Sequence, residues 1–180
     1  FSISADALLR VNTTGAGVQQ SLVLDGRAIE LAFDAAEAAA GPVFSLSLTG
    51  AVLDIAGVAT VKGSFTFSTG TAGDVFAGRG LSVFVGVGPA WLADGIRNPL
   101  ARGLFVTGAT VGVVRTGSGP SAQYAFVADG AVQLVGLTGV ALSGTLTIRV
   151  NTLGTTVTES IAVPGGDPVL VDFGAGEGDT

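Results

Sequence analysis

The sequence contains no cysteine, no histidine and no methionine. Without cysteine there is neither a disulfide framework nor a thiolate metal site. Without histidine, the commonest general base and the commonest zinc ligand are both missing, which excludes histidine-dependent catalytic triads and most transition-metal sites. We therefore expect a protein that is not an enzyme and that binds no transition metal or organic cofactor.

Charged residues are also few, at 12% of the chain, and the net charge is −6. Such a chain offers little to a phosphate backbone, so no nucleic-acid partner is expected. The uncharged run over residues 130–148 is long enough to raise the question of a membrane span. Its glycine, threonine and serine residues recur at strand-like intervals, so no transmembrane segment is predicted.

Most of the sequence alternates between apolar and polar residues, which predicts half-buried β-strands. In "VALSGTLTIRV", from Val140, the apolar residues share one face. "LSVFVGVG" and "ATVGVV" are apolar on both faces and are predicted to be central strands. Glycines recur within these patterns, where they usually mark bulges or bends. The long strands are therefore expected to turn corners and to pass from one sheet to another.

The fold class predicted from this pattern is all-β. We expect a glycine-bent antiparallel β-sandwich or flattened barrel, with a β-solenoid as the alternative. Helix is expected at most as one or two short turns, for which the candidates are residues 34–40 and the stretch "PAWLADGIRNPLARG".

One phrase occurs near each end of the chain: "RVNTTGAGVQQSLVLDG" from Arg10 and "RVNTLGTTVTESIAVPGG" from Arg149. The offset is about one domain in length, which favours one repeat period over about 8–146 followed by the start of the next over 147–180. Two similar hairpins within one sandwich are the alternative. If the repeat holds, each copy is expected to turn at "NT.G" and to bury Phe33 or Phe173, and the second copy is expected to complete the sheet of the first unit.

These segments, with "YAFVADGAVQLVGLTGVALSGTLTIRV" and "LSVFVGVG" between them, resemble a tandem-repeat module of giant, cysteine-poor bacterial surface or secreted proteins of the adhesin type. The resemblance implies a structural or adhesive role at the cell surface or outside the cell, and it carries no catalytic or ligand residues. Phe1 is not an initiator methionine, so we expect a processed or excised piece whose targeting segment lies outside it.

Acidic residues near turns make calcium the one metal to consider, because calcium requires several converging oxygen ligands. The candidate ligands are Asp25, Asp167, Asp172, Glu177 and Asp179. Solvated acidic turns are the alternative interpretation.

Trp91 and Tyr124 are candidate interface or sugar-binding aromatics, although Trp91 also suits a core position at one end of the domain. The function predicted first is a non-enzymatic repeat module whose partners are neighbouring copies or other subunits, bound at strand edges. A self-assembling fibre or matrix subunit, and a glycan- or lipid-binding β module, are the alternatives.

Overall fold

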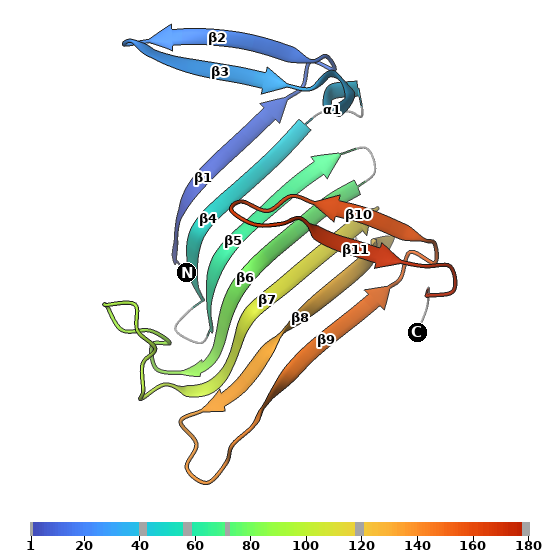
Figure 1. The fold of residues 1–180 in the computed structure, drawn as a ribbon. Coiled ribbons are helices and arrows are strands. Elements are labelled where there is room, and N and C mark those ends of the chain that lie inside the picture. The colour runs from blue at the N-terminus through green and yellow to red at the C-terminus, as the bar shows by residue number, and fades with distance from the viewer. Residues whose placement is uncertain (1, 40–42, 56–58, 71–72, 118–120, 178–180) are drawn as a thin grey trace.

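The computed structural model describes residues 2–39, 43–55, 59–70, 73–117 and 121–177 (Figure 1). Within them, one antiparallel sheet has the strand order β1-β4-β5-β6-β7-β8-β9, and two hairpins, β2–β3 and β10–β11, lie outside it. The strands of the large sheet are β1 (Ser2–Asn12), β4 (Val43–Ile55), β5 (Ala59–Gly70), β6 (Gly73–Val87), β7 (Arg102–Thr116), β8 (Gln123–Val135) and β9 (Ser143–Asn151). The hairpin strands are β2 (Val18–Leu24), β3 (Arg27–Phe33), β10 (Val157–Ile161) and β11 (Val169–Phe173). The predicted all-β fold is confirmed.

The sheet stays open, with β1 and β9 at its two edges, so the architecture is a broad sheet partly covered by a hairpin. The two segments predicted to be central lie in β6 and β7, in the middle of the strand order. The strands curve, as Figure 1 shows, but each stays within this one sheet. The expectation that strands pass from one sheet to another is therefore wrong.

Glycine positions coincide with breaks in the strand register. The β4–β5 register shifts between Leu48 and Ala51, next to Gly50 with φ of +59°, and the β6–β7 register shifts beside Gly80 with φ of +62°. Only glycine adopts this left-handed conformation without strain, and it is the conformation that an inserted bulge residue requires. The glycines therefore bend the sheet by means of bulges.

One short helix, α1 (Ala35–Ala39), forms at the predicted alanine-rich stretch, where the Asp34 carboxylate accepts a hydrogen bond from Ala36 N at 2.6 Å. The other candidate stretch, between β6 and β7, forms no helix. It folds back on itself through a bridge between Trp91 and Arg97 and a hydrogen bond from Asn98 Nδ2 to Pro89 O at 2.8 Å. No helix among the described residues is long and apolar enough to cross a membrane.

The "NT.G" turn is a corner between two sheets and not the tip of a hairpin, which corrects the expectation from sequence. In each copy the strand before it belongs to the large sheet and the strand after it begins a separate hairpin. The tip of the first hairpin is Asp25–Gly26, since Leu24 pairs with Arg27. Each repeated phrase thus leads from the sheet into a hairpin beside it.

Candidate functional site

The repeated phrase forms the same corner in both places, built on a buried asparagine. Asn12 Nδ2 donates to the carbonyl of Ala16 at 2.9 Å, and Asn151 Nδ2 donates to the carbonyl of Thr155 at 2.9 Å. Each Oδ1 accepts a hydrogen bond from the backbone N–H two residues further on, at 2.9 and 3.0 Å. The glycine three residues after each asparagine has φ of +69° and +67°. The asparagine side chain therefore replaces backbone partners that the chain loses at the corner.

An arginine two residues before each asparagine covers a phenylalanine of the hairpin. The Arg10 guanidinium carbon lies 4.9 Å from the ring centroid of Phe33, and that of Arg149 lies 4.6 Å from the ring centroid of Phe173. Each Nη2 also donates to the carbonyl of the residue before that phenylalanine, at 3.1 and 2.7 Å. Both distances to the ring are within the range of cation–π contacts, so each arginine fastens its hairpin to its sheet strand.

The two hairpins have the same register. Val18 pairs with Phe33 in the first, and Val157 pairs with Phe173 in the second. These partners differ by 139 and 140 positions, which is the offset of the sequence repeat and its one inserted residue. Residues 8–33 and 147–173 therefore have the same local structure, with hairpin tips of different length.

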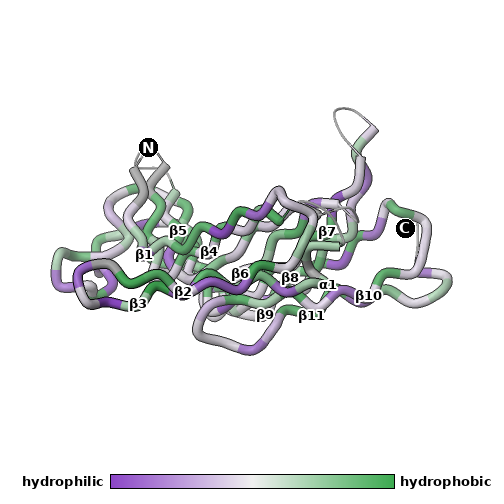
Figure 2. Tube along the Cα trace, turned by 90° about the horizontal axis from the view of Figure 1, so that it is seen from above, coloured by the Kyte–Doolittle hydropathy of each residue, from purple (hydrophilic) through white to green (hydrophobic). Residues whose placement is uncertain are grey.

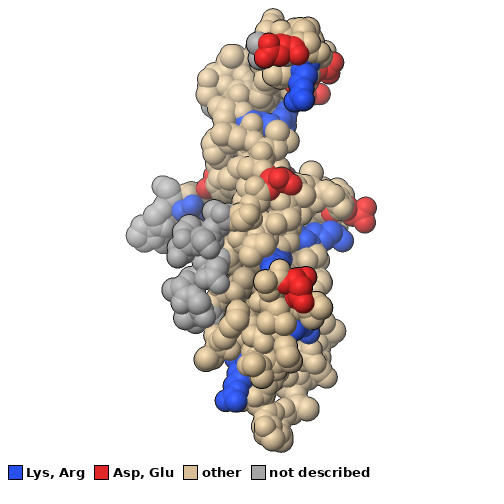
Figure 3. Space-filling model, turned by 90° about the vertical axis from the view of Figure 1, so that its left-hand side faces the viewer, with Lys and Arg blue, Asp and Glu red and all other residues tan. Residues whose placement is uncertain are grey.

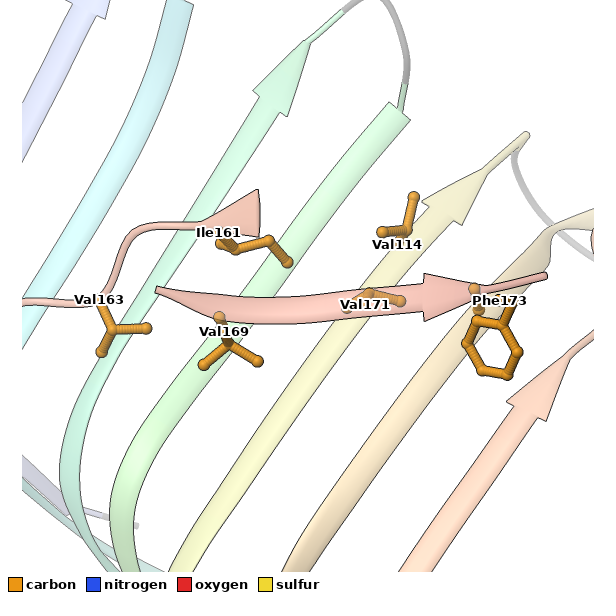
Figure 4. Packing of buried hydrophobic residues seen from close by; sticks show 8 residues of the cluster. Val114, Ile161, Val163, Val169, Val171 and Phe173 are labelled. Carbon is orange, nitrogen blue, oxygen red and sulfur yellow. The ribbon is translucent and has the colours of Figure 1, made fainter. Parts of the chain in front are cut away.

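The second copy covers the large sheet. The β10–β11 hairpin lies across β6, β7 and β8 (Figures 1 and 4), and its inward side chains form the main buried cluster with the sheet. The cluster consists of Ala77, Val114 and Ala125 from the sheet and Ile161, Val163, Val169, Val171 and Phe173 from the hairpin segment. Gly112 lies beneath it, since a Cβ built there would be 2.6 Å from Val171 Cγ2. The hairpin is therefore seated closely on small sheet residues.

The first hairpin does not lie across the large sheet in the part of the chain that the structure describes. This β2–β3 hairpin projects beyond the β1 edge of the sheet (Figure 1). Leu22, Ile29 and Leu31 are 51%, 48% and 44% exposed, whereas their counterparts in the second copy, Ile161, Val169 and Val171, are 4%, 1% and 0% exposed. The same apolar face is thus buried in one hairpin and open in the other.

Both hairpins leave the sheet from the same face, and Figure 2 shows them at opposite sides of the molecule. Residues paired directly opposite one another share a face, and a line of such pairs crosses all seven strands of the described sheet. It runs through Arg10, Ser45, Ser68, Val75, Val114, Ala125 and Asn151. This face is apolar on β6–β8, beneath the second hairpin, and carries serine on β4 and β5, which the hairpin strands do not cross.

The opposite face is apolar across the whole width of the described sheet. Here the line of paired residues is Leu9, Leu46, Phe67, Phe76, Val113, Phe126 and Val150. Phenylalanine rings contact one another across this face, for example Phe44 and Phe67 with centroids 6.2 Å apart. Seen from the β1 side, the surface is mostly uncharged, with acidic and basic residues scattered along its length (Figure 3).

The candidate calcium ligands do not converge where the structure describes them. The Glu177 carboxylate accepts hydrogen bonds from Gly174 N at 2.7 Å and from Arg149 at 3.3 Å, and Asp172 Oδ1 accepts one from Thr158 at 2.9 Å. Asp25 forms the tip of the first hairpin, far along the chain from Asp167. Asp179 lies outside the described residues. Within the described ranges, no group of three or more acidic residues is placed to hold a metal ion.

Trp91 and Tyr124 lie at opposite ends of the sheet. Trp91 precedes the start of β7 and packs edge-on against Phe105, with ring centroids 5.5 Å apart. The Lys62 ammonium lies 4.3 Å from the centroid of the Trp91 ring. Tyr124 is exposed and pairs near the end of β7, opposite Arg115. The two aromatics do not form one site.

The sequence indicated the repeated phrase but predicted a hairpin turn where the structure has a corner between sheets. The arginine–phenylalanine contacts and the open face of the first hairpin were not predicted. The signal for the contacts was present, because Arg10 and Phe33 recur with Asn12 at matching positions in the second copy. A comparison with known proteins finds no matching family model, no matching curated protein and no matching solved structure.

Proposed function

We propose that the chain is a non-enzymatic structural unit of a tandem array, located outside the cell or at its surface, where each unit acts as a spacer. The observation that carries this proposal is the equivalence of residues 8–33 and 147–173, in corner, register and arginine–phenylalanine contact. The resemblance to cysteine-poor surface arrays supports the location.

The position of the two copies favours an array over two similar hairpins within one closed sandwich. β1 and β9 are the two edges of the sheet, and each copy begins at its own edge. In a single closed unit, both hairpins are expected to cover the sheet. Here only the second hairpin does so, while the first presents its apolar face beyond the edge.

The sequence of the parent gene on both sides of this chain tests the array directly. We expect further copies of the "RVNT.G" corner, each followed by a hairpin and by strands like β4–β8, with a period close to 139 residues. Unrelated domains on both sides contradict the array.

Self-assembly into a fibre or matrix is a second candidate, which the apolar face opposite the hairpins favours. Stacked sheets bury such faces against each other. Sedimentation velocity over a range of concentrations is the test, comparing the unsubstituted chain with Phe67→Glu, which places a charge on that face, and with Leu22→Glu on the first hairpin as a control. Loss of association in Phe67→Glu alone supports stacking, and a monomer at every concentration contradicts it.

A further inference from the structure

β1 and β9 are equivalent strands, but each lacks the neighbour that the other has. Among the described residues, β1 pairs only with β4 and β9 pairs only with β8, so each strand has one edge without a partner strand. The two strands run in the same direction, because the sheet order separates them by six antiparallel pairings. One strand of this kind could therefore pair with a β8 on one side and a β4 on the other.

The hydrogen bonds of β9 show which of its residues direct their backbone N–H and C=O groups towards β8 and which direct them to the open edge. Alternate residues of an antiparallel ladder direct their N–H and C=O groups to opposite sides. Thr152 N donates to Tyr124 O at 2.8 Å, so Val150 and Ile148, at two-residue spacing, also direct their backbone groups towards β8. Arg149, between them, directs its backbone groups to the open edge.

The same rule shows which backbone groups of β1 face its open edge. Arg10 and Arg149 reach their hairpins from the same face of strands that run the same way. For L-residues, strand direction and side-chain face together fix the edge to which the backbone groups point. Leu9 and Val11, the counterparts of Ile148 and Val150, therefore direct their N–H and C=O groups to the open edge of β1, where an antiparallel β8 would meet them.

We propose that β1 is shared by two adjoining units, pairing with β8 of the preceding unit on one edge and with β4 of its own unit on the other. The register follows from the β8–β9 pairing and puts Leu8 opposite Asp129, and Val11 opposite Phe126, of the preceding unit. The partner is a second copy of this unit in the same polypeptide, and the joined sheets form one continuous sheet. This inference rests on the proposed tandem array and specifies how its units are joined.

The shared strand accounts for the open face of the first hairpin. With β8 of the preceding unit beside β1, the β2–β3 hairpin lies across β6–β8 of that unit, as β10–β11 does in this chain. Leu22, Ile29 and Leu31 are then buried against small residues such as the counterparts of Ala77 and Gly112. An open strand edge is also a site of unwanted association, which the neighbouring unit covers.

A two-unit chain tests the junction: residues 1–146 followed directly by residues 8–180, so that 8–33 take the place of 147–173. Because the sequence has no cysteine, introduced pairs are the only thiols. On the β8 side the pair is Asp129→Cys in the first unit with Leu8→Cys at the junction. On the β4 side the pair is Leu9→Cys at the junction with Leu46→Cys in the second unit, which face each other in β1–β4.

Controls fix the geometry of the crosslinks. In the single chain, Asp129→Cys with Thr147→Cys should form a disulfide, because these residues are opposite each other in the β8–β9 pair. In the two-unit chain, Asp129→Cys with Thr145→Cys of the first unit is the displaced pair, because Thr145 lies two residues before the junction Leu8 and is paired with Ala131. This pair should not crosslink, since disulfides need Cα atoms within about 7 Å.

The shared strand predicts loss of free thiols at both matched pairs within one two-unit chain, and retention of free thiols in the displaced pair. Crosslinking on one side only overturns the proposal, because the units then fold as separate bodies. Crosslinked dimers in place of internal disulfides also overturn it, because the partner is then a separate chain. A parent gene without repeats contradicts the proposed array, whatever the crosslinks show. A parent gene with repeats, together with a two-unit chain that does not form the two disulfides, contradicts the shared strand and leaves the array standing.

Discussion

Matched alanine substitutions at Val171 and Leu31 compare one position in a covered hairpin with the same position in an open one. Val171 is 0% exposed and Leu31 is 44% exposed. Val171→Ala removes two carbon groups worth about 0.8 kcal/mol each on burial, and a residual cavity above Gly112 adds to this, so we expect a loss of about 2–3 kcal/mol. Leu31→Ala removes more carbon, but from a side chain on the open face of its hairpin, so we expect a loss of less than about 1 kcal/mol.

Urea and thermal unfolding measure both variants, followed by circular dichroism and by the fluorescence of Trp91, the only tryptophan. Coincident transitions from the two probes establish two-state behaviour. For a chain of this size the loss at Val171 corresponds to a melting temperature lower by about 4–12 °C. Equal losses at the two positions would refute the assignment of β10–β11 as cover and β2–β3 as open face, and so would a loss below about 0.5 kcal/mol at Val171.

Three further predictions concern the same elements. Gly112→Ala should destabilise by about 1–3 kcal/mol, because its Cβ meets Val171, and Val171→Ala in the same chain should recover part of that loss, as a double-mutant cycle measures. Asn151→Ala should cost about 1–3 kcal/mol in urea unfolding, since it leaves a corner carbonyl without its donor, and a neutral result would contradict the role of the asparagine. In hydrogen exchange by NMR, the amides of Leu9 and Val11 should exchange faster than that of the residue between them, and the reverse order would refute the assigned open edge.

The alternation of apolar residues was sufficient to predict the strands and the fold class. Segments apolar on both faces became β6 and β7, and register breaks lie beside glycines such as Gly50 and Gly80. The stretch after Pro89 was less predictable, because its turn depends on Asn98 bonding back to Pro89, a contact between residues that the local pattern does not relate.

The sequence could not predict which hairpin face is buried. Alternation shows which residues share a face, but it does not show which other element packs against that face. Ile29, Leu31 and Phe33 share a face, as do Val169, Val171 and Phe173, and the two patterns are equally apolar. Only the sheet beside each hairpin distinguishes them. The same reason applies to calcium, because the positions of acidic residues in the sequence do not show whether their carboxylates lie close together. Calcium binding stays a prediction, which the melting temperature with and without calcium tests.

The equivalence of the two copies is tested most directly by a chimera in which residues 8–33 replace 147–173. We expect cooperative unfolding and native circular dichroism, with stability lower by about 1–3 kcal/mol because Ile29 and Leu31 are larger than the Val169 and Val171 they replace. Returning both to valine in the chimera should restore most of that stability. A chimera that stays uncooperative even with both valines, with fast-exchanging amides across β6–β8, would contradict the claim that the first hairpin is built to cover a sheet like this one.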